Sequence, residues 1–441
     1  MKKFFLSFVV ISFMLLNLGC KKSPIGPNET LSVSIEDVSC TEAWVKITTT
    51  NYQTPNTLTL FVNDKVDESI MLNSIDTLLY IDSLLPNQSY KIKAAFANNN
   101  QLQTTNEVIA KTMDTTSHNF TWQTFTFGEH SSSTLYDVAI IDENNIWAVG
   151  EIYMNDSLGK PDPNNYNAAH WNGSKWELIK IAGSGGWVCR TVFAFSENNI
   201  WFEGTINWDG KKYSVHNNGF PLEPNGDGWQ INKMWGTSNS NLYAVGNTGN
   251  IAHYDGKRWQ KIESGTDVDL KDIYGTPEGK TVWISGYEDF KPTVLLKISN
   301  SIIETVFSSR DYLFIFESEH ISGGIGGVWT NNNNFVYLTS WYSLYRKSIY
   351  SHSSQAVALR SSNPTIFFGL KSRGTDINNI FTIGSRNNIH HYNGVTFTTY
   401  EEPPDNNVTY YGLDVKTNLS VLCGQKFKNG ISDKAIITLI K

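Results

Sequence analysis

A short motif recurs through most of this chain, and its spacing limits what the chain can fold into. The motif is an asparagine, two or three β-forming residues and, in most copies, a glycine. The clear copies are NIWAVG (145–150), NIWFEG (199–204), NLYAVG (241–246) and NIFTIG (379–384), and the weaker ones are TVWISG (281–286), NFVYLTS (334–340) and NLSVLCG (418–424). Their central residues lie 54, 42, 40, 54, 44 and 40 positions apart. Each interval is long enough for four short antiparallel strands, so we predict seven repeated sheets.

The segments around each motif predict the other strands of one repeat. LYDVAIID (135–142) precedes the first copy as an innermost strand, and IAHYDG (251–256) and KRWQKIES (257–264) follow the third copy as third and outer strands. The Asp-Gly and Asn-Gly pairs predict tight hairpin turns, because both central residues of such turns need a positive φ. Sheets of this kind in a ring form a β-propeller, which we predict for residues 119–441.

The last repeat offers only three strands, and the missing one is predicted at the other end of the domain. FTWQTFTF (120–127) carries Trp122-Gln123 where other repeats carry Trp229-Gln230 and Trp259-Gln260. An N-terminal strand that completes the C-terminal blade would remove two exposed sheet edges. The repeats resemble bacterial propellers of the YVTN and BNR-like families over about 320 residues. The resemblance implies an architecture and no particular activity.

Residues 30–113 predict a separate small domain. Short alternating strands such as LSVSIEDV (31–38), AWVKITTT (43–50) and SYKIKAAF (89–96) indicate a β-sandwich. Leu85, Pro86 and Tyr90 are placed as in the tyrosine corner of fibronectin type III domains, which this segment resembles. The resemblance implies a spacer or interaction module. Residues 114–118 are predicted to be the linker, so the fold class is all-β, with a fibronectin III-like sandwich and a seven-bladed propeller of four-stranded blades.

The N-terminus has the layout of a secretory signal. Lys2 and Lys3 precede an apolar run that ends shortly before Gly19 and Cys20. The segment resembles a bacterial lipoprotein signal, which implies removal of residues 1–19, lipid attachment at Cys20 and a tether over residues 20–29. The alternative is an ordinary signal peptide with an incidental cysteine. We expect a protein anchored in the cell envelope at the outer membrane, facing either the periplasm or the surface.

Composition excludes some partners and suggests no cofactor. The chain has 35 basic and 42 acidic residues, a formal charge of -7, so it has no electrostatic footprint for nucleic acid. Apart from Cys20, the cysteines are Cys40, Cys189 and Cys423, which are too scattered to indicate a disulfide framework or a metal motif. We predict no metal and no cofactor, and we expect a monomer.

Histidines and carboxylates are the residues in which catalytic chemistry would be sought. His170, His216, His253 and His391 each precede a turn glycine by three positions. Equivalent positions in different blades are spread around a ring and cannot meet one metal ion, so a structural role is predicted. Five acids fall at or just after second strands, where a glycosidase could use a pair of them. They are Glu151, Glu203, Asp209, Glu288 and Asp289.

The two faces of the predicted ring differ in their loops. Turns between first and second strands are short, whereas the loops between second and third strands vary in length and carry aromatic residues. Such loops are frequent binding sites, and exposed aromatic rings stack on sugars or anchor protein partners. The ligand-face candidates are Tyr153, Tyr166, Trp187, Trp208, Trp341 and Tyr342. We predict non-catalytic binding or scaffolding of a glycan or an envelope protein, and the alternative is a glycosidase or lyase that uses the loop carboxylates.

Overall fold

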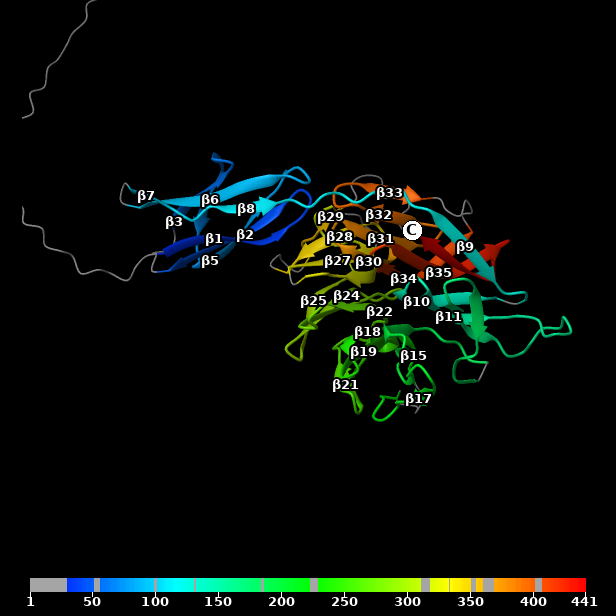
Figure 1. The fold of residues 1–441 in the computed structure, drawn as a ribbon. Coiled ribbons are helices and arrows are strands. Elements are labelled where there is room, and N and C mark those ends of the chain that lie inside the picture. Colours follow the sequence, from blue (N-terminus) through cyan, green and yellow to red (C-terminus); the bar gives the residue numbers. More distant parts are fainter. Residues whose placement is uncertain are drawn as a thin grey trace, which may run out of the picture. The chain divides into compact units, whose positions relative to one another are not determined.

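The computed structural model describes residues 30–50, 56–98, 101–130, 132–183, 186–222, 229–310, 318–332, 334–349, 354–359, 369–400 and 407–441. The predicted signal peptide, Cys20 and the tether lie outside these residues. The chain divides into two compact units, the first ending at Thr112 and the second running from Met113 to Lys441 (Figure 1). Within the described ranges, the helical segments are two 3₁₀ turns, Ile181–Gly183 and Asn247–Gly249. The all-β prediction is therefore confirmed, and no helix found there is long and apolar enough to cross a bilayer.

The first unit consists of two antiparallel sheets around one apolar core. One sheet has β1 (Thr30–Val38), β2 (Ala43–Thr50) and β5 (Asp76–Ile81), and the other has β3 (Asn56–Val62), β4 (Lys65–Leu72), β6 (Ser89–Asn98), β7 (Gln101–Thr104) and β8 (Val108–Lys111). Both sheets contribute to the core, for example Val45 from β2 and Leu60 from β3, because alternate residues of each strand point inward. The backbone N–H of Leu85 donates to the Tyr90 hydroxyl at 2.8 Å.

The second unit contains seven four-stranded antiparallel sheets among the residues described. The first four are β10 (Thr134–Asp142) to β13 (Trp176–Ile179), β14 (Val192–Ser196) to β17 (Tyr213–Val215), β18 (Ile231–Ser238) to β21 (Trp259–Glu263), and β22 (Leu270–Gly275) to β25 (Ile302–Ser309). Their middle strands are β11 (Asn145–Ile152), β12 (Tyr166–Trp171), β15 (Asn199–Phe202), β16 (Ile206–Trp208), β19 (Asn241–Gly246), β20 (Asn250–Tyr254), β23 (Thr281–Gly286) and β24 (Thr293–Ser299).

The other three sheets include the one that joins both ends of the unit. They are β26 (Ile325–Trp329), β27 (Phe335–Ser340), β28 (Leu344–Ser348) and β29 (Val357–Ala358); β30 (Gly369–Asp376), β31 (Asn379–Gly384), β32 (Ile389–Tyr392) and β33 (Phe397–Tyr400); and β34 (Val408–Lys416), β35 (Leu419–Lys428), β36 (Ile431–Ile440) and β9 (Trp122–Phe127). The first strands contact one another in chain order from β10 to β34, and β34 contacts β10. The arrangement is propeller-like, with first strands innermost.

The predicted pairing of residues 120–127 with the last sheet is present. In Figure 1 the teal strand β9 lies among the red strands of the chain's end, and Trp122 pairs with Ile440 while Phe127 pairs with Ala435. Thr121 and Lys441 exchange two backbone hydrogen bonds of 2.7 and 3.0 Å. Aromatic side chains of this segment pack into the cores on either side, because its alternate residues face opposite ways.

Residues 114–118 lie along the sheet formed by β30 to β33. The Asn378 side chain donates to the Asp114 carbonyl at 2.8 Å, and Asn393 donates to the Thr116 carbonyl at 3.2 Å. The Tyr400 hydroxyl donates to the His118 carbonyl at 2.8 Å. These contacts attach the segment to the second unit.

In the second repeat, the prediction that Trp208 lies in a loop between second and third strands was wrong. Trp208 ends β16, which is itself the third strand, and the Asp209-Gly210 turn follows it. Asn207 therefore faces Trp201, as His170 faces Trp147 in the first repeat. The link between β15 and β16 is short because Glu203 and Gly204 both take positive φ, 48° and 69°. Because β16 is the third strand of this repeat, His216, which follows the outer strand β17, is not equivalent to the other three histidines.

Candidate functional site

Bulges in the innermost strands arrange their side chains in layers along the axis of the ring. In β10, the register shifts between Leu135 and Asp137, and β18, β22, β26, β30 and β34 shift near their starts in the same way. An extra residue re-aims the side chains around it. Bulge residues such as Tyr136 and Lys271 line a small cavity at one end of the axis. Residues two or three positions further, such as Ala139 and Tyr274, line a larger cavity towards the other end.

Buried charges form the layer between the two cavities. The Lys233 ammonium lies 2.5 Å from Asp137 Oδ1, and the Arg373 guanidinium makes two bonds of 2.7 and 2.8 Å to the carboxylate of Asp272. Lys371 Nζ lies 3.6 Å from Asp272 Oδ1. Burial opposes ionisation of Asp272, but Arg373 and Lys371 outweigh it and lower the pKa of this carboxyl to about 2. The Asp272–Arg373 pair therefore stays charged at neutral pH.

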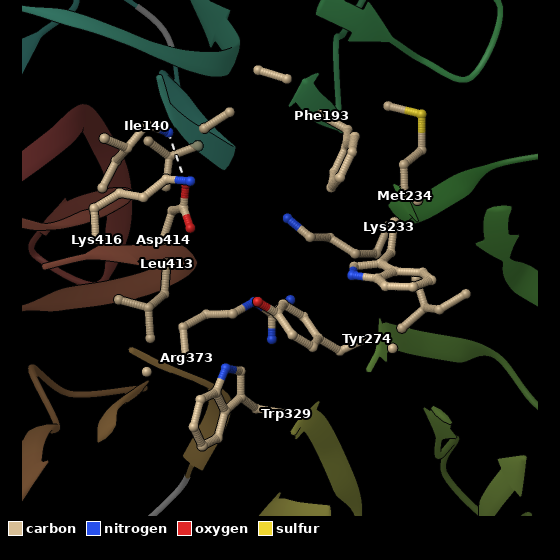
Figure 2. Close-up of a pocket in the computed structure, with 18 of the residues that line it drawn as sticks. Ile140, Phe193, Lys233, Met234, Tyr274, Trp329, Arg373, Leu413, Asp414 and Lys416 are labelled. Atoms are coloured by element: carbon tan, nitrogen blue, oxygen red, sulfur yellow. Dashed lines mark hydrogen bonds between the residues drawn. The ribbon is translucent and has the colours of Figure 1, made fainter. Parts of the chain in front are cut away.

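The aspartates in this layer also connect neighbouring sheets. The backbone N–H of Val192 donates to Asp137 Oδ2 at 3.1 Å, and that of Val328 donates to Asp272 Oδ2 at 3.0 Å. Asp414 accepts the N–H of Ile140 at 2.8 Å in the same manner, the contact drawn as a dashed line in Figure 2. Each bond joins an innermost strand to the next one in the ring. Asp137 and Asp272 occupy equivalent positions just after the bulges, whereas Asp414 lies two residues beyond the equivalent position of its strand and lines the larger cavity.

The larger cavity has aromatic walls and a volume of about 400 Å³. Phe193, Trp235, Tyr274 and Trp329 line it, and Figure 2 shows the Phe193, Tyr274 and Trp329 rings arranged around a space that Lys233 and Arg373 also approach. Thr237, Pro277, Thr375 and Lys416 are also in its lining, so it opens towards the short turns between first and second strands. A cavity with aromatic walls and several converging polar groups has the character of a ligand pocket.

The structure does not bring the six predicted ligand-face residues together. The Tyr153 hydroxyl donates to Glu151 at 2.8 Å, Tyr166 lies 4.8 Å below the Lys180 ammonium, and the Trp187 carbonyl accepts from Asn165. Tyr153 follows β11, Tyr166 begins β12 and Trp187 follows β13. Trp341 and Tyr342 connect β27 to β28 in a different sheet.

Trp208 lies at the opposite end of its sheet from the predicted face, because it directly precedes a turn between third and outer strands. Its ring packs 4.8 Å from that of Tyr213. None of the six lines either axial cavity.

All four histidines have packed, hydrogen-bonded imidazoles; His216 contacts the Tyr254 hydroxyl at 3.3 Å, and the other three make one hydrogen bond of the same kind. His170, His253 and His391 each bond through Nε2 to the first asparagine of the motif, Asn145, Asn241 and Asn379, at 3.0 Å. Their rings also lie within 4.4 to 4.6 Å of the aromatic residue of the same motif. Burial lowers the pKa of His391 to about 3, so this imidazole is neutral at physiological pH. The asparagine that opens these three motifs is therefore explained by this hydrogen bond.

The loop carboxylates have separate structural contacts. Glu151 accepts from two tyrosines, Tyr136 and Tyr153, and Asp209 accepts the backbone N–H groups of its own turn. Glu288 pairs with Lys291 at 3.1 Å. Asp209, like Trp208, lies on the short-turn side. These contacts give no support to the alternative of a catalytic acid pair.

Glu203 should make the stability of the protein depend on pH. Burial raises the pKa of this carboxyl to about 7 from 4.5, against hydrogen bonds from the N–H groups of Arg190 and Thr191. A folded-state pKa above the unfolded value means that the native state binds the extra proton, so stability falls as pH rises from about 4.5 to about 7.

Glu203→Gln keeps the acceptor oxygen and removes the charge. As the pH rises from 5 to 8, the free energy of unfolding of the variant should increase by roughly 2–3 kcal/mol relative to that of the wild type. Urea unfolding at both pH values measures this, with the exposed Glu263→Gln as the control. If the free energy of unfolding of Glu203→Gln and of the wild type depended on pH in the same way, the raised pKa of Glu203 would be contradicted.

These sheets and cavities define an all-β protein with a propeller-like unit. No family model matches the chain, and no curated protein matches it. Among solved structures it is similar to "YCF48 bound to D1 peptide", at 15% identity with a TM-score of 0.50, covering 72% of this chain and 94% of that one. It is also similar to the β-propeller domain of Myceliophteria thermophila Cps50 (Swd1), at 9% identity and a TM-score of 0.47, covering 73% and 98%. At such identities, the first likeness supports the fold alone.

Proposed function

We propose that this protein is a lipid-anchored component of the cell envelope that binds a segment of another protein without chemically changing it. Cys20 would carry the lipid, a fibronectin III-like unit would serve as the spacer, and a closed seven-bladed propeller would carry the binding site. The signal layout that ends at Cys20 motivates the anchor. The Leu85–Tyr90 hydrogen bond and the cyclic contacts of the first strands support the two domain assignments.

The observation that carries the binding proposal is the aromatic cavity of Figure 2. Aromatic side chains supply most of the energy at protein interfaces when they are rigidly held, and Trp235 and Trp329 are 6% and 1% exposed. The charges beside them are already paired, as Lys233 is with Asp137 and Arg373 with Asp272. A cavity without a poised acid or nucleophile suits binding better than catalysis. The similar YCF48 structure holds a peptide, which is consistent with protein binding in general.

Substitution of two cavity residues tests this proposal. Phe193→Ala removes part of the aromatic wall, and Lys416→Glu reverses an exposed charge at its rim. We expect each to weaken the captured interaction at least about tenfold. Residues 24–441 would be screened against envelope proteins and a glycan array, and the affinities of the ligands found would be measured by biolayer interferometry.

Two variants serve as controls in this experiment. Lys428→Glu is a matched charge reversal at an exposed position outside the cavity, and Trp208→Ala/Trp341→Ala removes two of the predicted ligand-face residues. Both should bind normally if the cavity is the site. Loss of binding only in the Trp208→Ala/Trp341→Ala variant would show that the binding site lies at those residues and not in the cavity. Capture of glycans alone would contradict the choice of a protein ligand.

A further inference from the structure

The second axial cavity lies at the opposite end of the axis, and the proposed function does not use it. Its volume is about 260 Å³, and its lining includes Tyr136, Arg190, Lys271, Tyr287, Lys371 and Tyr411. Arg190 precedes β14 and Tyr287 follows β23, so this cavity opens on the side of the longer loops between second and third strands. It combines three cationic side chains with three tyrosines and has no carboxylate among its described lining residues, whereas the larger cavity includes Asp414.

Two of the cations have incomplete partners within the described chain. The Arg190 guanidinium lies 4.8 Å over the ring of Tyr136, and no described carboxylate is within 4 Å of it. Lys371 is only 8% exposed, and its nearest carboxylate oxygen, 3.6 Å away, belongs to Asp272, which Arg373 already holds with two hydrogen bonds. A buried ammonium without a close acceptor is unfavourable unless another anion approaches it.

Two tyrosine hydroxyls add neutral donors. Gln425 Nε2 donates to the Tyr411 hydroxyl oxygen at 2.6 Å, so this hydroxyl keeps its own hydrogen for donation. The Tyr287 ring packs edge-to-face against Trp341, with 5.3 Å between the ring centroids. Among the described residues, neither hydroxyl donates a hydrogen bond to another group of the protein. Burial raises the pKa of Tyr411 to about 12 and raises that of Tyr287, so both remain donors at neutral pH.

The charge balance around this cavity favours an anion of low charge. Five cations lie in or next to it: Arg190, Lys271, Lys371, Lys233 and Arg373. Five carboxyl groups lie beside them: Glu151, Glu203, Asp269, Asp137 and Asp272. Glu203, with a pKa of about 7, is only partly ionised at neutral pH. The carboxylates already accept hydrogen bonds from the protein, whereas Arg190 and Lys371 still face the cavity. With no large positive excess, a monoanion is better matched than a dianion such as phosphate.

The size of the cavity narrows the class of ligand further. Pockets for drug-sized ligands start at about 300 Å³, so this one suits a single small group. The Tyr136 and Tyr287 rings lie beside cations, with Lys271 at 5.7 Å from the latter, which leaves less aromatic surface for a sugar. We propose that this cavity binds a carboxylate group, with Arg190 and Lys371 as cationic partners and Tyr287 and Tyr411 as neutral donors. A free small acid or the C-terminus of a peptide chain could present that group, since both share this chemistry.

Four probes test the proposal on residues 24–441, which include every residue described above. They are acetate, inorganic phosphate, and the peptide acetyl-Ala-Ala-Ala with either a free or an amidated C-terminus. Binding would be measured by ligand-observed NMR on the wild type, Tyr287→Phe/Tyr411→Phe and Arg190→Gln. The matched control is Tyr243→Phe, which removes a hydroxyl from β19, outside the cavity.

We expect acetate and the free-acid peptide to bind, and the amide to bind at least about tenfold more weakly. Both the double tyrosine variant and Arg190→Gln should reduce carboxylate binding at least about tenfold, while Tyr243→Phe should not. Tighter binding of the free-acid peptide than of acetate would identify a chain terminus as the source, and equal binding would identify a small acid.

Three results would overturn the proposal: preference for phosphate, equal affinity for the acid and amide peptides, or carboxylate binding that the cavity variants leave unchanged. Failure of every carboxylate to bind would overturn it as well. The larger cavity is tested separately through Phe193 and Lys416, so failure of one proposal does not decide the other.

Discussion

Replacing Asp272 by alanine is expected to lower the free energy of unfolding of the propeller-like unit by about 3–5 kcal/mol. Asp272 is fully buried and is the carboxylate that Arg373 grips with two hydrogen bonds. Its removal leaves the guanidinium and the Lys371 ammonium without a counter-charge inside the ring. The backbone N–H of Val328 also loses its acceptor, which weakens the contact between two neighbouring sheets.

Urea unfolding monitored by tryptophan fluorescence measures this effect. Asp267→Ala is the matched control, because Asp267 is 81% exposed and pairs with Lys291 at 3.3 Å, so it should cost less than about 1 kcal/mol. The double variant Asp272→Ala/Arg373→Met should recover part of the loss, since it no longer buries an unpaired guanidinium. A loss below about 1 kcal/mol for Asp272→Ala would show that the buried pairs contribute little to stability.

A chain that lacks residues 1–128 should fail to fold, whereas one that lacks residues 1–112 should fold. The longer deletion removes β9 and leaves β36 as an unpaired edge. It also removes the aromatic residues Phe120, Trp122, Phe125 and Phe127 from two cores. These four side chains are partly buried, so each contributes about half of the roughly 1.5–3 kcal/mol of a fully buried one. Together they contribute about 3–6 kcal/mol, a large part of the total stability of about 5–15 kcal/mol that domains have.

Circular dichroism and thermal unfolding of the two truncated proteins would compare them directly. Addition of a synthetic peptide of residues 113–130 to the shorter protein should restore a cooperative transition, because the peptide supplies the missing strand. Cooperative unfolding of residues 129–441 alone would mean that the three strands β34, β35 and β36 suffice for the last sheet.

The order of strands in most repeats could be predicted because local sequence patterns mark the strands and turns of each repeat. Alternating apolar residues define strands, the asparagine of each motif bonds a histidine in three of the repeats, and Asp-Gly or Asn-Gly pairs define the turns. The closing strand was predictable for the same reason, since Trp122-Gln123 repeats a pattern found elsewhere. The second repeat was misread where Glu203 takes a positive φ, because glutamate gives no sign of such a turn.

The axial cavities could not be predicted from local patterns. Asp272 and Arg373 are 101 residues apart, and Lys233 and Asp137 are 96 apart, so only closure of the ring brings each pair together. Each residue looks like an ordinary polar position of a strand. The sequences of the innermost strands do contain a pattern that predicts these charges. The segments YDVAI, NKMWG, KDIYG and LKSRG carry charged residues at inward positions and are otherwise largely apolar. Aligning the first strands would have placed these charges at one level of the axis.

The pairing of β9 with β36 also sets the order in which the protein can be completed. Thr121 and Lys441, which bond to each other beside this pairing, are 320 residues apart in the chain. During synthesis, β9 cannot pair with β36 until β36 has left the ribosome, so the last sheet cannot form before then. Contacts between residues far apart in the chain also form slowly. Until the pairing forms, the aromatic residues of β9 have no partner strand, which leaves the incomplete chain prone to pairing with other chains.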